Sequence, residues 1–335
     1  MMRRLGWYLA ASIAILALGA GVLWLYAANL LAPAANHAVD RVVGIPRGAN
    51  VPQIGRILET TGTVRSARAF YYYVLVNRLG PGIKAGEHVL NASLSTPEIV
   101  QRLIEGRFKL YRLTLPEGLT MTETAAAAAR SGRADETEFM ALCRDPEFIR
   151  SVGLDDENLE GYLFPDTYHF VRGTTTRQVV KALVDRFLQV WKRYEARAAE
   201  RGMSRREVVT LASIIEKETG AREERPLIAS VFLNRLRRGM RLETDPTVIY
   251  GIKDFNGNLT RKHLETPTPY NTYIISGLPP GPIANPGEES IRAVLYPAES
   301  EYLFFVSRND GTHYFSRSLT EHNRAVWRYQ KQGRR

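Results

Sequence analysis

Two glutamates near the end of one predicted helix are the residues of this chain best suited to chemistry. Residues 204–219 have the sequence SRREVVTLASIIEKET. Ser204 and Glu207 have the spacing of a capping box, so the helix starts at this serine. Apolar side chains recur on one face at helical spacing, at Val208, Leu211, Ala212 and Ile215. Glu218 lies at the edge of this apolar stripe, whereas Glu216 lies further round the helix on the other side.

A carboxyl group at the border of a hydrophobic core can act as a general acid. Removal from water disfavours the charged form and raises the pKa of the group. A raised pKa keeps a carboxyl group protonated near neutral pH, ready to donate its proton. Glu218 fits this description. The pattern alone supports equally well an ion pair between Glu218 and an arginine of residues 222–225, with no chemical role.

Other classes of catalytic site find little support in the sequence. The histidines lack any zinc-binding spacing; they are His37, His88, His169, His263, His313 and His322. The chain has no Gly-x-Ser-x-Gly nucleophile elbow and no phosphate-binding loop. Its one cysteine, Cys143, cannot form an intramolecular disulfide, and its helix-like surroundings favour a structural role. We therefore predict no metal and no cofactor.

The first residues predict a membrane anchor. The run from Leu5 to Ala28 has no charged residue and is long enough to cross a bilayer, which needs roughly 20 residues. Arg3 and Arg4 precede this run, and the next basic residue is Arg41. The positive-inside rule therefore places the N-terminus in the cytoplasm.

This anchor sets the compartment of the rest of the chain. We predict a cytoplasmic tail at residues 1–4, a single-pass anchor in the inner membrane at 5–28, and a stalk at 29–40, followed by a periplasmic catalytic part. A cleaved signal peptide with a processing site at 32–34 is less favoured, because its apolar region usually has only ~7–15 residues. In both cases the residues after 35 lie outside the cytoplasm. The net charge of +10 then points to membrane lipids or wall polymer rather than to nucleic acid.

The rest of the chain predicts an α+β protein. A small module at residues 41–115 alternates strands and helices, with strands expected at 42–46, 85–90 and 109–115 and helices at 51–58, 70–79 and 95–105. Helices dominate residues 116–335; they are expected at 122–131, 137–143, 176–201, 204–219 and 318–330. Proline and glycine cluster at 266–297, which suggests a long structured loop. Near the C-terminus, strands at 302–307 and 312–316 flank a turn and predict a β-hairpin.

Several long motifs, in order along the chain, resemble those of the endolytic murein transglycosylase (YceG-like) family. They are LEGYLFPDTY at 159–168, LASIIEKET at 211–219, MRLETDPTVIYG at 240–251, TPTPYNTY at 266–273, SGLPPGPIANPG at 276–287, and HYFS at 313–316 with His322 and Asn323. The resemblance covers the whole chain. It implies a LysM-like, glycan-contacting module at 41–115. It also implies a mainly helical, lysozyme-like transglycosylase domain at 116–335.

The resemblance also implies a reaction. The pair Glu218–Thr219 resembles the Glu-Ser pair on the catalytic helix of other lytic transglycosylases, which selects Glu218 over Glu216. The family cuts the β-1,4 bond between MurNAc and GlcNAc in peptidoglycan without water. One carboxylic acid protonates the leaving oxygen, and the same carboxylate then takes the proton of the C6 hydroxyl, which leaves a 1,6-anhydro end. This needs one carboxylate, whereas ordinary glycosidases use two.

Further residues are candidates for substrate binding. The resemblance places Tyr270 and Asn271 in a substrate loop, although turn formation after Pro269 explains them equally well. Glu160 and Tyr162 precede a proline on a loop that we expect to line the cleft. Glu160 could orient Glu218 or bind sugar hydroxyls, and a solvated loop acid explains it equally well. The remaining candidates are Asp245, which an Asx-turn or a helix cap would also explain, and Tyr273, for which core packing is the favoured alternative.

The leading hypothesis is an endolytic lytic transglycosylase that terminates the elongation of nascent glycan strands. Its expected partners are peptidoglycan strands, the lipid bilayer through residues 5–28, and peptidoglycan synthases. One alternative is a muramidase that hydrolyses the same bond. Another is a non-catalytic scaffold that binds the wall.

Overall fold

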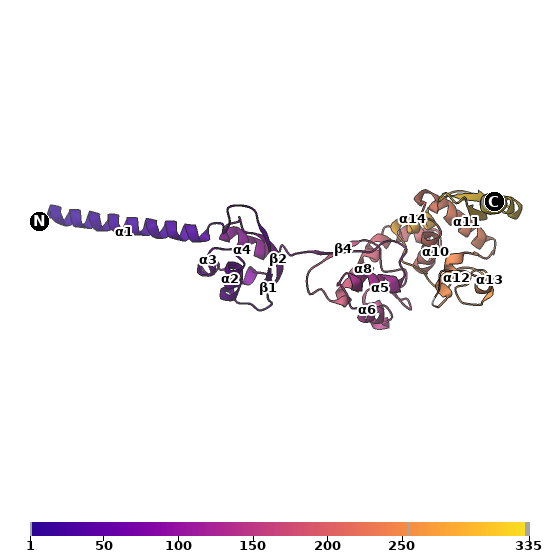
Figure 1. The fold of residues 1–335 in the computed structure, drawn as a ribbon, viewed down its shortest axis with the longest axis horizontal. Helices are drawn as coiled ribbons and strands as arrows, with labels where there is room; N and C mark the ends of the chain where they lie inside the picture. Colours follow the sequence, from indigo (N-terminus) through magenta and orange to yellow (C-terminus); the bar gives the residue numbers. More distant parts are fainter. Residues whose placement is uncertain (1, 254, 332–335) are drawn as a thin grey trace. The chain divides into compact units, whose positions relative to one another are not determined.

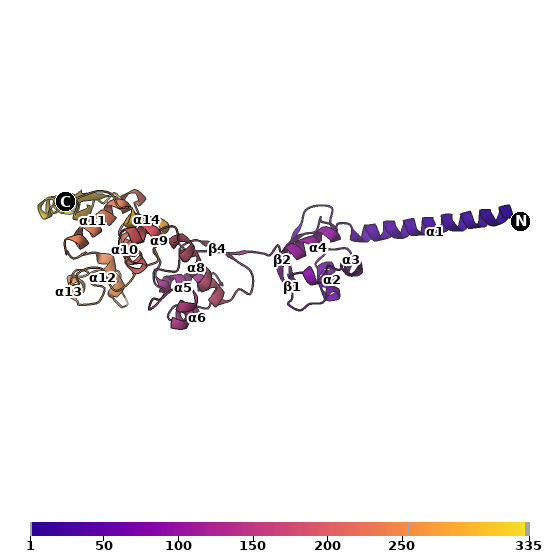
Figure 2. The ribbon, with the colours of Figure 1, turned by 180° about the vertical axis from the view of Figure 1, so that it is seen from behind.

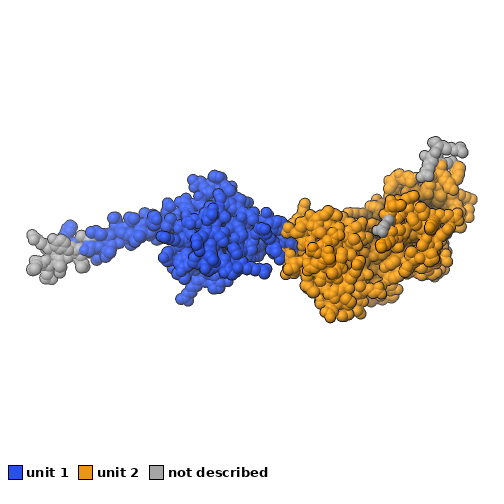
Figure 3. All heavy atoms as spheres, turned by 60° about the horizontal axis from the view of Figure 1, so that its bottom comes forward, with its two compact units in different colours: residues 1–111, 169–173 blue, residues 112–168, 174–335 orange. Residues whose placement is uncertain are grey.

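The computed structural model describes residues 2–253 and 255–331 of the chain (Figure 1). Contacts divide these residues into two compact units, coloured in Figure 3. Unit 1 runs up to Tyr111 and includes His169–Gly173. Unit 2 comprises Arg112–Tyr168 and the residues from Thr174 onward.

Unit 1 consists of a long N-terminal helix and a small α/β module. Its elements are α1 (Met2–Leu31), β1 (Asp40–Ile45), α2 (Val51–Thr60), α3 (Ala67–Val76), the 3-10 turn η1 (Gly80–Gly82), β2 (Gly86–Asn91) and α4 (Thr96–Glu105). Helix α1 covers the anchor predicted at residues 5–28 and continues for three residues beyond it. Its stretch Ser12–Leu31 is long and apolar enough to cross a membrane, with a mean hydropathy of 1.9.

In the module, three helices pack around a two-stranded sheet. Strands β1 and β2 pair antiparallel, with Val43 opposite His88. Alternation along β1 turns Val43 and Ile45 into the core, where they meet apolar residues of the three helices. The predicted capping box of Ser95 with Glu98 is confirmed at the start of α4. Helices α2 and α3 approach closely at Gly55, where a Cβ atom would lie 2.9 Å from the carbonyl oxygen of Ala67.

The third predicted strand of the module pairs elsewhere. Strand β3 (Tyr111–Thr114) forms a separate two-stranded sheet with β4 (Thr167–Phe170). Each of these strands passes from one unit to the other. The segment His169–Gly173 that follows belongs to unit 1. A division at residue 115 therefore misses a chain segment that returns from far along the sequence, because sequence patterns do not show long-range pairing.

Unit 2 is mainly helical. Its helices are α5 (Met121–Arg130), α6 (Glu136–Leu142), α7 (Pro146–Ser151), α8 (Thr176–Trp191), α9 (Glu195–Glu200), α10 (Arg205–Glu218), α11 (Arg225–Arg237), α12 (Asp245–Gly251), α13 (Arg261–Glu265), α14 (Glu288–Leu295) and α15 (Leu319–Val326). The short turns are η2 (Arg222–Glu224) and the π-helical η3 (Trp327–Lys331). Strands β5 (Phe304–Ser307) and β6 (His313–Ser316) form the predicted antiparallel hairpin near the C-terminus.

Helix α10 is the central helix of unit 2. It starts with the predicted capping box of Ser204 and Glu207. All eight residues from Val208 to Ile215 are buried, so α10 is enclosed more completely than the predicted single stripe. Helices α9, α11, α12 and α14 pack against it. The hydroxyl of Ser213 accepts a 3.0 Å bond from the amide of Ile283, which fixes the Pro/Gly-rich segment to α10.

Two helix predictions differ from the structure. The helix expected at 176–201 is broken between α8 and α9, around Tyr194. The Tyr194 hydroxyl donates a 2.7 Å hydrogen bond to Glu288, and Arg193 pairs with the same carboxylate at 2.8 Å. Glu288 begins α14, a helix within the segment that we expected to be loop. These contacts join the break before α9 to the start of α14, and local periodicity reveals neither feature.

Candidate active site

Glu218 is the last residue of α10 and lines a cleft of about 470 Å³. The helix ends here because Thr219 has an extended backbone, with φ −141° and ψ 137°. Glu218 is half-buried. The walls of the cleft come from residues 242–245, Tyr273, the β5–β6 hairpin and α15. The predicted acid therefore stands between a buried helix and an open space of a size typical for ligands.

Burial raises the pKa of Glu218 to about 7. The hydroxyl of Thr244 opposes this rise by donating a hydrogen bond to the carboxylate. The negative charge of Asp245 raises the pKa further, and His313 lowers it. A carboxyl group with this pKa is about half protonated at neutral pH, so it can both donate and accept a proton there.

Thr244 is held in place by two parts of unit 2. Arg235 is buried and donates hydrogen bonds to the carbonyl oxygens of Arg241, at 3.1 Å, and Leu242, at 2.9 Å. The Thr272 hydroxyl accepts a 3.1 Å bond from the amide of Thr244. These bonds come from a helix and from a distant loop, and they fix the segment that presents Thr244 to Glu218.

Asp245 brings a second carboxylate to the same cleft. It is the first residue of α12 and accepts a 2.7 Å hydrogen bond from the hydroxyl of Tyr273. Burial and this bond to Asp245 raise the pKa of Tyr273, so the phenol stays a donor. Asp245, predicted only as a binding residue, lines the same cleft as Glu218, and its charge acts on the Glu218 carboxyl group.

His313 closes the cleft from the hairpin. Its Nδ1 lies 2.7 Å from a carboxylate oxygen of Glu224, and its amide donates to the other oxygen at 2.9 Å. The hairpin is thereby tied to η2, which follows α10 directly. Thr244, His313 and Arg235 were absent from the sequence-based site. Two of them lie in motifs quoted above, at 240–251 and 313–316, but their role depends on tertiary neighbours.

Glu216 has a different environment. Its carboxylate pairs with the buried Arg225 at 2.7 Å and accepts a 2.9 Å bond from the amide of Gly287. Among the described residues, Glu218 forms no ion pair with a lysine or arginine. The arginine of residues 222–225 that could have neutralised Glu218 pairs instead with Glu216 and Glu117. The carboxyl group of Glu218 can therefore act in the cleft, whereas the carboxylate of Glu216 is held in an internal ion pair.

Comparison with known proteins decides the family. The model of the YceG-like family matches residues 43–328. A Bacillus subtilis protein named endolytic murein transglycosylase is 34% identical over 326 residues, which cover 92% of this chain and 90% of that protein. The chain belongs to the YceG-like family. The membership predicted from the motifs is thus confirmed.

Two further relatives of this YceG-like protein extend the comparison. A Streptococcus pneumoniae protein, also named endolytic murein transglycosylase, is 30% identical over 351 residues, which cover 94% of this chain and 63% of that protein. The crystal structure of a YceG-like protein from Listeria monocytogenes matches with a TM-score of 0.59 and 36% identity, covering 86% of this chain and 99% of that one. The fold of the present chain is therefore mixed α/β. Helices form the majority of its described elements, and one apolar helix lies at the N-terminus.

Two predicted binding residues, Glu160 and Tyr270, lie in a second cluster around Tyr250, and Tyr162 packs in the core. Glu160 is only 4% exposed; it accepts a 2.8 Å bond from the amide of Met121 and a 3.1 Å bond from the hydroxyl of Tyr250. Burial raises its pKa to about 7. The ring of Tyr270 lies 4.8 Å from that of Tyr250. Tyr162 is buried and its ring contacts Phe187 edge-on. The predicted sugar contacts of these residues stay predictions.

Asn271 is fully buried and acts within its own loop. Its side-chain amide donates to the carbonyl oxygens of His263, Leu264 and Thr266, and its Oδ1 accepts from the amide of Tyr273. These bonds hold Tyr273 where it can reach Asp245. Of the six predicted binding residues, Asp245 and Tyr273 share the cleft with Glu218. Asn271 is buried outside the cleft and holds the backbone of Tyr273 in place.

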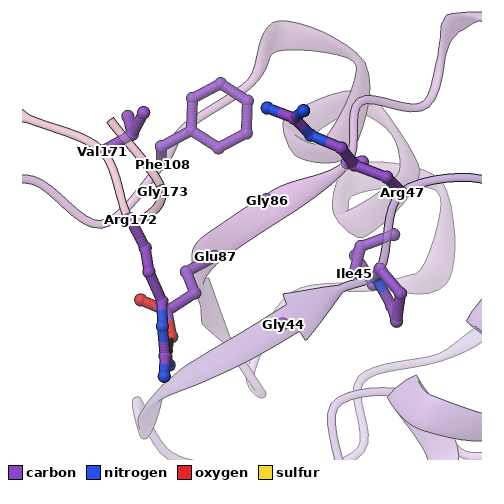
Figure 4. Close-up of a pocket in the computed structure, with 11 residues that line it drawn as sticks. Gly44, Ile45, Arg47, Gly86, Glu87, Phe108, Val171, Arg172 and Gly173 are labelled. Carbon is purple, nitrogen blue, oxygen red and sulfur yellow. Dashed lines mark hydrogen bonds and ion pairs between the residues drawn. The ribbon is translucent and has the colours of Figure 1, made fainter. Parts of the chain in front are cut away.

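Unit 1 has a pocket of its own, of about 370 Å³ (Figure 4). Figure 4 shows Arg47, Phe108 and the Glu87–Arg172 pair around the strand that carries Gly86. Glu87 accepts a 2.6 Å bond from the hydroxyl of Tyr111 and pairs with Arg172 at 2.5 Å. Gly86 is required here, because its φ is +143° and a Cβ atom would lie 2.6 Å from the Phe108 ring. The pocket thus offers an aromatic face, an exposed arginine and a paired carboxylate.

Residues 2–253 and 255–331 hold no group of three or more histidine, cysteine, aspartate or glutamate side chains arranged to bind a metal ion. Cys143 is buried, and burial raises the pKa of its thiol, so it is a poor nucleophile.

Proposed function

We propose that this protein is an endolytic murein transglycosylase that cleaves peptidoglycan glycan strands with Glu218 as its acid and base. The observation that carries the proposal is a carboxyl group with a pKa of about 7 on the wall of an open cleft. The names of the Bacillus and Streptococcus relatives support the same substrate and reaction class.

The reaction needs one proton to move twice. Glu218 donates its proton to the glycosidic oxygen as the bond from this oxygen to C1 of MurNAc breaks. The carbonyl oxygen of the sugar's own N-acetyl group takes up the positive charge that develops at C1. The Glu218 carboxylate then removes the proton of the C6 hydroxyl while that oxygen bonds to C1. Glu218 ends protonated as it began, and the product carries a 1,6-anhydro ring.

The neighbours of Glu218 suit these steps. The Asp245 carboxylate, oriented by Tyr273, stabilises the positive charge at C1. It also keeps the pKa of Glu218 high enough for the first proton transfer. Thr244 works in the opposite direction, because its hydroxyl favours the carboxylate that must act as the base. The two neighbours together balance the acid and base roles of one group.

Asp245 also gives a specific reason to consider hydrolysis. Glycosidases that use water need a second carboxylate beside the acid, and Asp245 lies in the same cleft. A hydrolytic muramidase is therefore the second candidate function. The two reactions differ by one molecule of water at the new muramic end.

Product analysis separates the candidates. The full chain in detergent is incubated with uncrosslinked glycan strands, and the fragments are weighed by mass spectrometry. A lytic transglycosylase gives muramic ends that are one water lighter than those of a hydrolase. Fragment lengths show whether cutting is internal. Ends that have gained water would overturn the lytic mechanism, and cleavage that survives Glu218→Gln would remove Glu218 as the acid. No cleavage by the wild-type chain would favour the non-catalytic scaffold.

We further propose that the module of unit 1 is LysM-like and contacts the glycan strand at the pocket of Figure 4. Phe108 offers a face on which a sugar ring can stack, and Arg47 offers donors for sugar oxygens. Phe108→Ala should weaken strand binding several-fold while the rate on saturating strands stays close to that of the wild type. Equal affinity in both proteins would remove the pocket from the binding surface.

The place of the protein in the cell follows from α1. We propose that α1 crosses the inner membrane once, with the N-terminus in the cytoplasm and unit 2 in the periplasm, near the synthases that produce new strands. A protease added outside spheroplasts should digest unit 2 and spare a tag at the N-terminus. The reverse pattern would overturn the orientation.

A further inference from the structure

Helix α3 carries an exposed apolar face. Phe70 and Val74 point into the module core. On the other side Tyr72, Leu75 and Val76 are 60%, 55% and 78% exposed. Positions 72, 75 and 76 share one side of a helix. Three neighbouring exposed hydrophobic residues on a short helix are unusual for a surface that faces only water.

This helix lies beside the proposed membrane anchor. Helices α1 and α3 are in contact. Arg65, just before α3, donates a 2.6 Å bond to the carbonyl oxygen of Pro33 and a 3.0 Å bond to the side chain of Asn29. Figures 1 and 2 both show α3 on the side of the module toward α1, and β2 on the far side.

The length of the anchor helix shows at which depth of the membrane the contact between α1 and α3 lies. The apolar stretch Ser12–Leu31 has 20 residues, which span about 30 Å as a helix, the thickness of the hydrocarbon core. Asn29 and Pro33 stand at the C-terminal end of this stretch and of the charge-free run that begins at Leu5, so they lie close to one boundary of that core. Arg65 binds both of them, so α3 begins at the level of the lipid head groups.

The charged residues around α3 suit a position at the level of the lipid head groups. Arg65, Arg68 and Arg78 are exposed, and α3 itself contains no acidic residue. At the start of the helix, Glu59 accepts a 3.1 Å hydrogen bond from the amide of Ala67. Arginine side chains can extend to lipid phosphates while their stems cover apolar surface, and tyrosine is enriched at membrane interfaces. A cationic edge around an apolar face is the pattern of a helix that lies in the interface.

We propose that α3 is a second membrane contact, with Tyr72, Leu75 and Val76 inserted into the interfacial zone of the bilayer beside α1. This inference rests on the proposed anchor. It fixes the orientation of the module as well as its distance from the membrane. Because α3 and the strands lie on different sides of the module, the pocket at Gly86 is kept open toward the periplasm.

Depth-dependent quenching tests this contact in the full chain. Cys143→Ala provides a cysteine-free background. Single cysteines at Val76→Cys, Val42→Cys and Trp24→Cys are labelled with an environment-sensitive fluorophore, and each protein is reconstituted into vesicles of phosphatidylethanolamine and phosphatidylglycerol that contain spin-labelled lipid. Val42 is the matched control, because it is an exposed valine on β1 of the same module. Trp24 reports on the anchor itself.

The label at position 76 should lose several-fold more fluorescence than the label at position 42, with a blue-shifted emission. Equal quenching at 76 and 42, with strong quenching at 24, would overturn the contact of α3 and leave the anchor intact. Absent quenching at 24 would refute the anchor and this inference together, while strand cleavage in the same sample reports separately on Glu218. Disulfide-linked dimers of the unlabelled Val76→Cys protein, together with no lipid quenching of the labelled one, would assign the face to a second copy of the chain and overturn the contact with lipid.

Discussion

The carboxyl groups of Glu218 and Glu160 have the same pKa, about 7, and for the same main reason, burial. Their surroundings differ. Glu160 is almost completely buried, and both of its oxygens accept hydrogen bonds from Met121 and Tyr250. Glu218 lines a cleft and has only Thr244 as a donor in the described part of the chain.

The comparison separates burial from catalytic function. A raised pKa shows that a group has been removed from water, and structural carboxyl groups share this property. Catalysis also requires space for a substrate and a free oxygen that can reach it. Glu218 has both, whereas Glu160 is enclosed and held by Met121 of α5 and Tyr250 of α12. Glu160 therefore serves as the internal control for Glu218, and the predictions below test this pair.

The largest expected effect is that of replacing each carboxyl group by an amide. Glu218→Gln should reduce the cleavage rate by about 10²–10⁴-fold, the contribution usual for a general acid and base, while strand binding is retained. Glu160→Gln should stay within a few-fold of the wild-type rate, because a glutamine can keep the bonds to Met121 and Tyr250. Rates from fragment release under saturating strands give the comparison. An equal loss in both variants would show that Glu160 also takes part in the reaction.

Asp245→Asn should have the next largest effect. The change removes the charge that we propose to stabilise C1, so it should lower the cleavage rate by roughly 10²-fold. It should also lower the pKa of Glu218, since Asp245 raises it. Tyr273→Phe keeps the carboxylate and removes only its donor, so its loss should be smaller. A switch from anhydro ends to anhydro-free ends in either variant would contradict a purely electrostatic role.

The pH profile tests the balance at Glu218 more finely. The protonated acid starts the reaction, so kcat/KM should fall about tenfold per pH unit once the pH exceeds the pKa of about 7. Thr244→Val removes a hydrogen bond that favours the carboxylate, so this alkaline limb should move to higher pH. Asp245→Asn should move it to lower pH. Shifts of the same sign in both variants would refute the assignment of the limb to Glu218.

Part of this site could be predicted from local sequence. The capping box at Ser204 and the apolar spacing after it placed Glu218 at the edge of a buried helix, because these signals act within one helix. They could not choose between Glu218 and Glu216. The choice depends on Arg225 and Gly287, which reach Glu216 only in the folded chain.

The rest of the site depends on distant contacts. Thr244 faces Glu218 because Arg235 and Thr272 hold its segment, and no local pattern encodes those bonds. Long motifs such as the one at 240–251 marked the segment without giving its geometry. In the fold, the same limitation hid the break before α9 and the pairing of β3 with β4. The C-terminal hairpin was predictable because its turn and both strands are adjacent in sequence.

The smallest expected effect is a change in thermal stability, and it comes from Glu160, the enclosed carboxyl group of the pair Glu218 and Glu160. The folded state holds a proton on Glu160 up to a pH of about 7, whereas the unfolded chain releases it near the ordinary glutamate pKa of 4.5. Unfolding is therefore favoured as the pH rises through this window, and the loss is complete above pH 7. Glu160→Gln has no proton to lose. Its melting temperature relative to the wild type should rise by a few degrees, roughly, between pH 4 and pH 8. Thermal melts of both proteins at the two pH values measure this difference, and a constant difference would show that Glu160 titrates alike in the folded and unfolded chain.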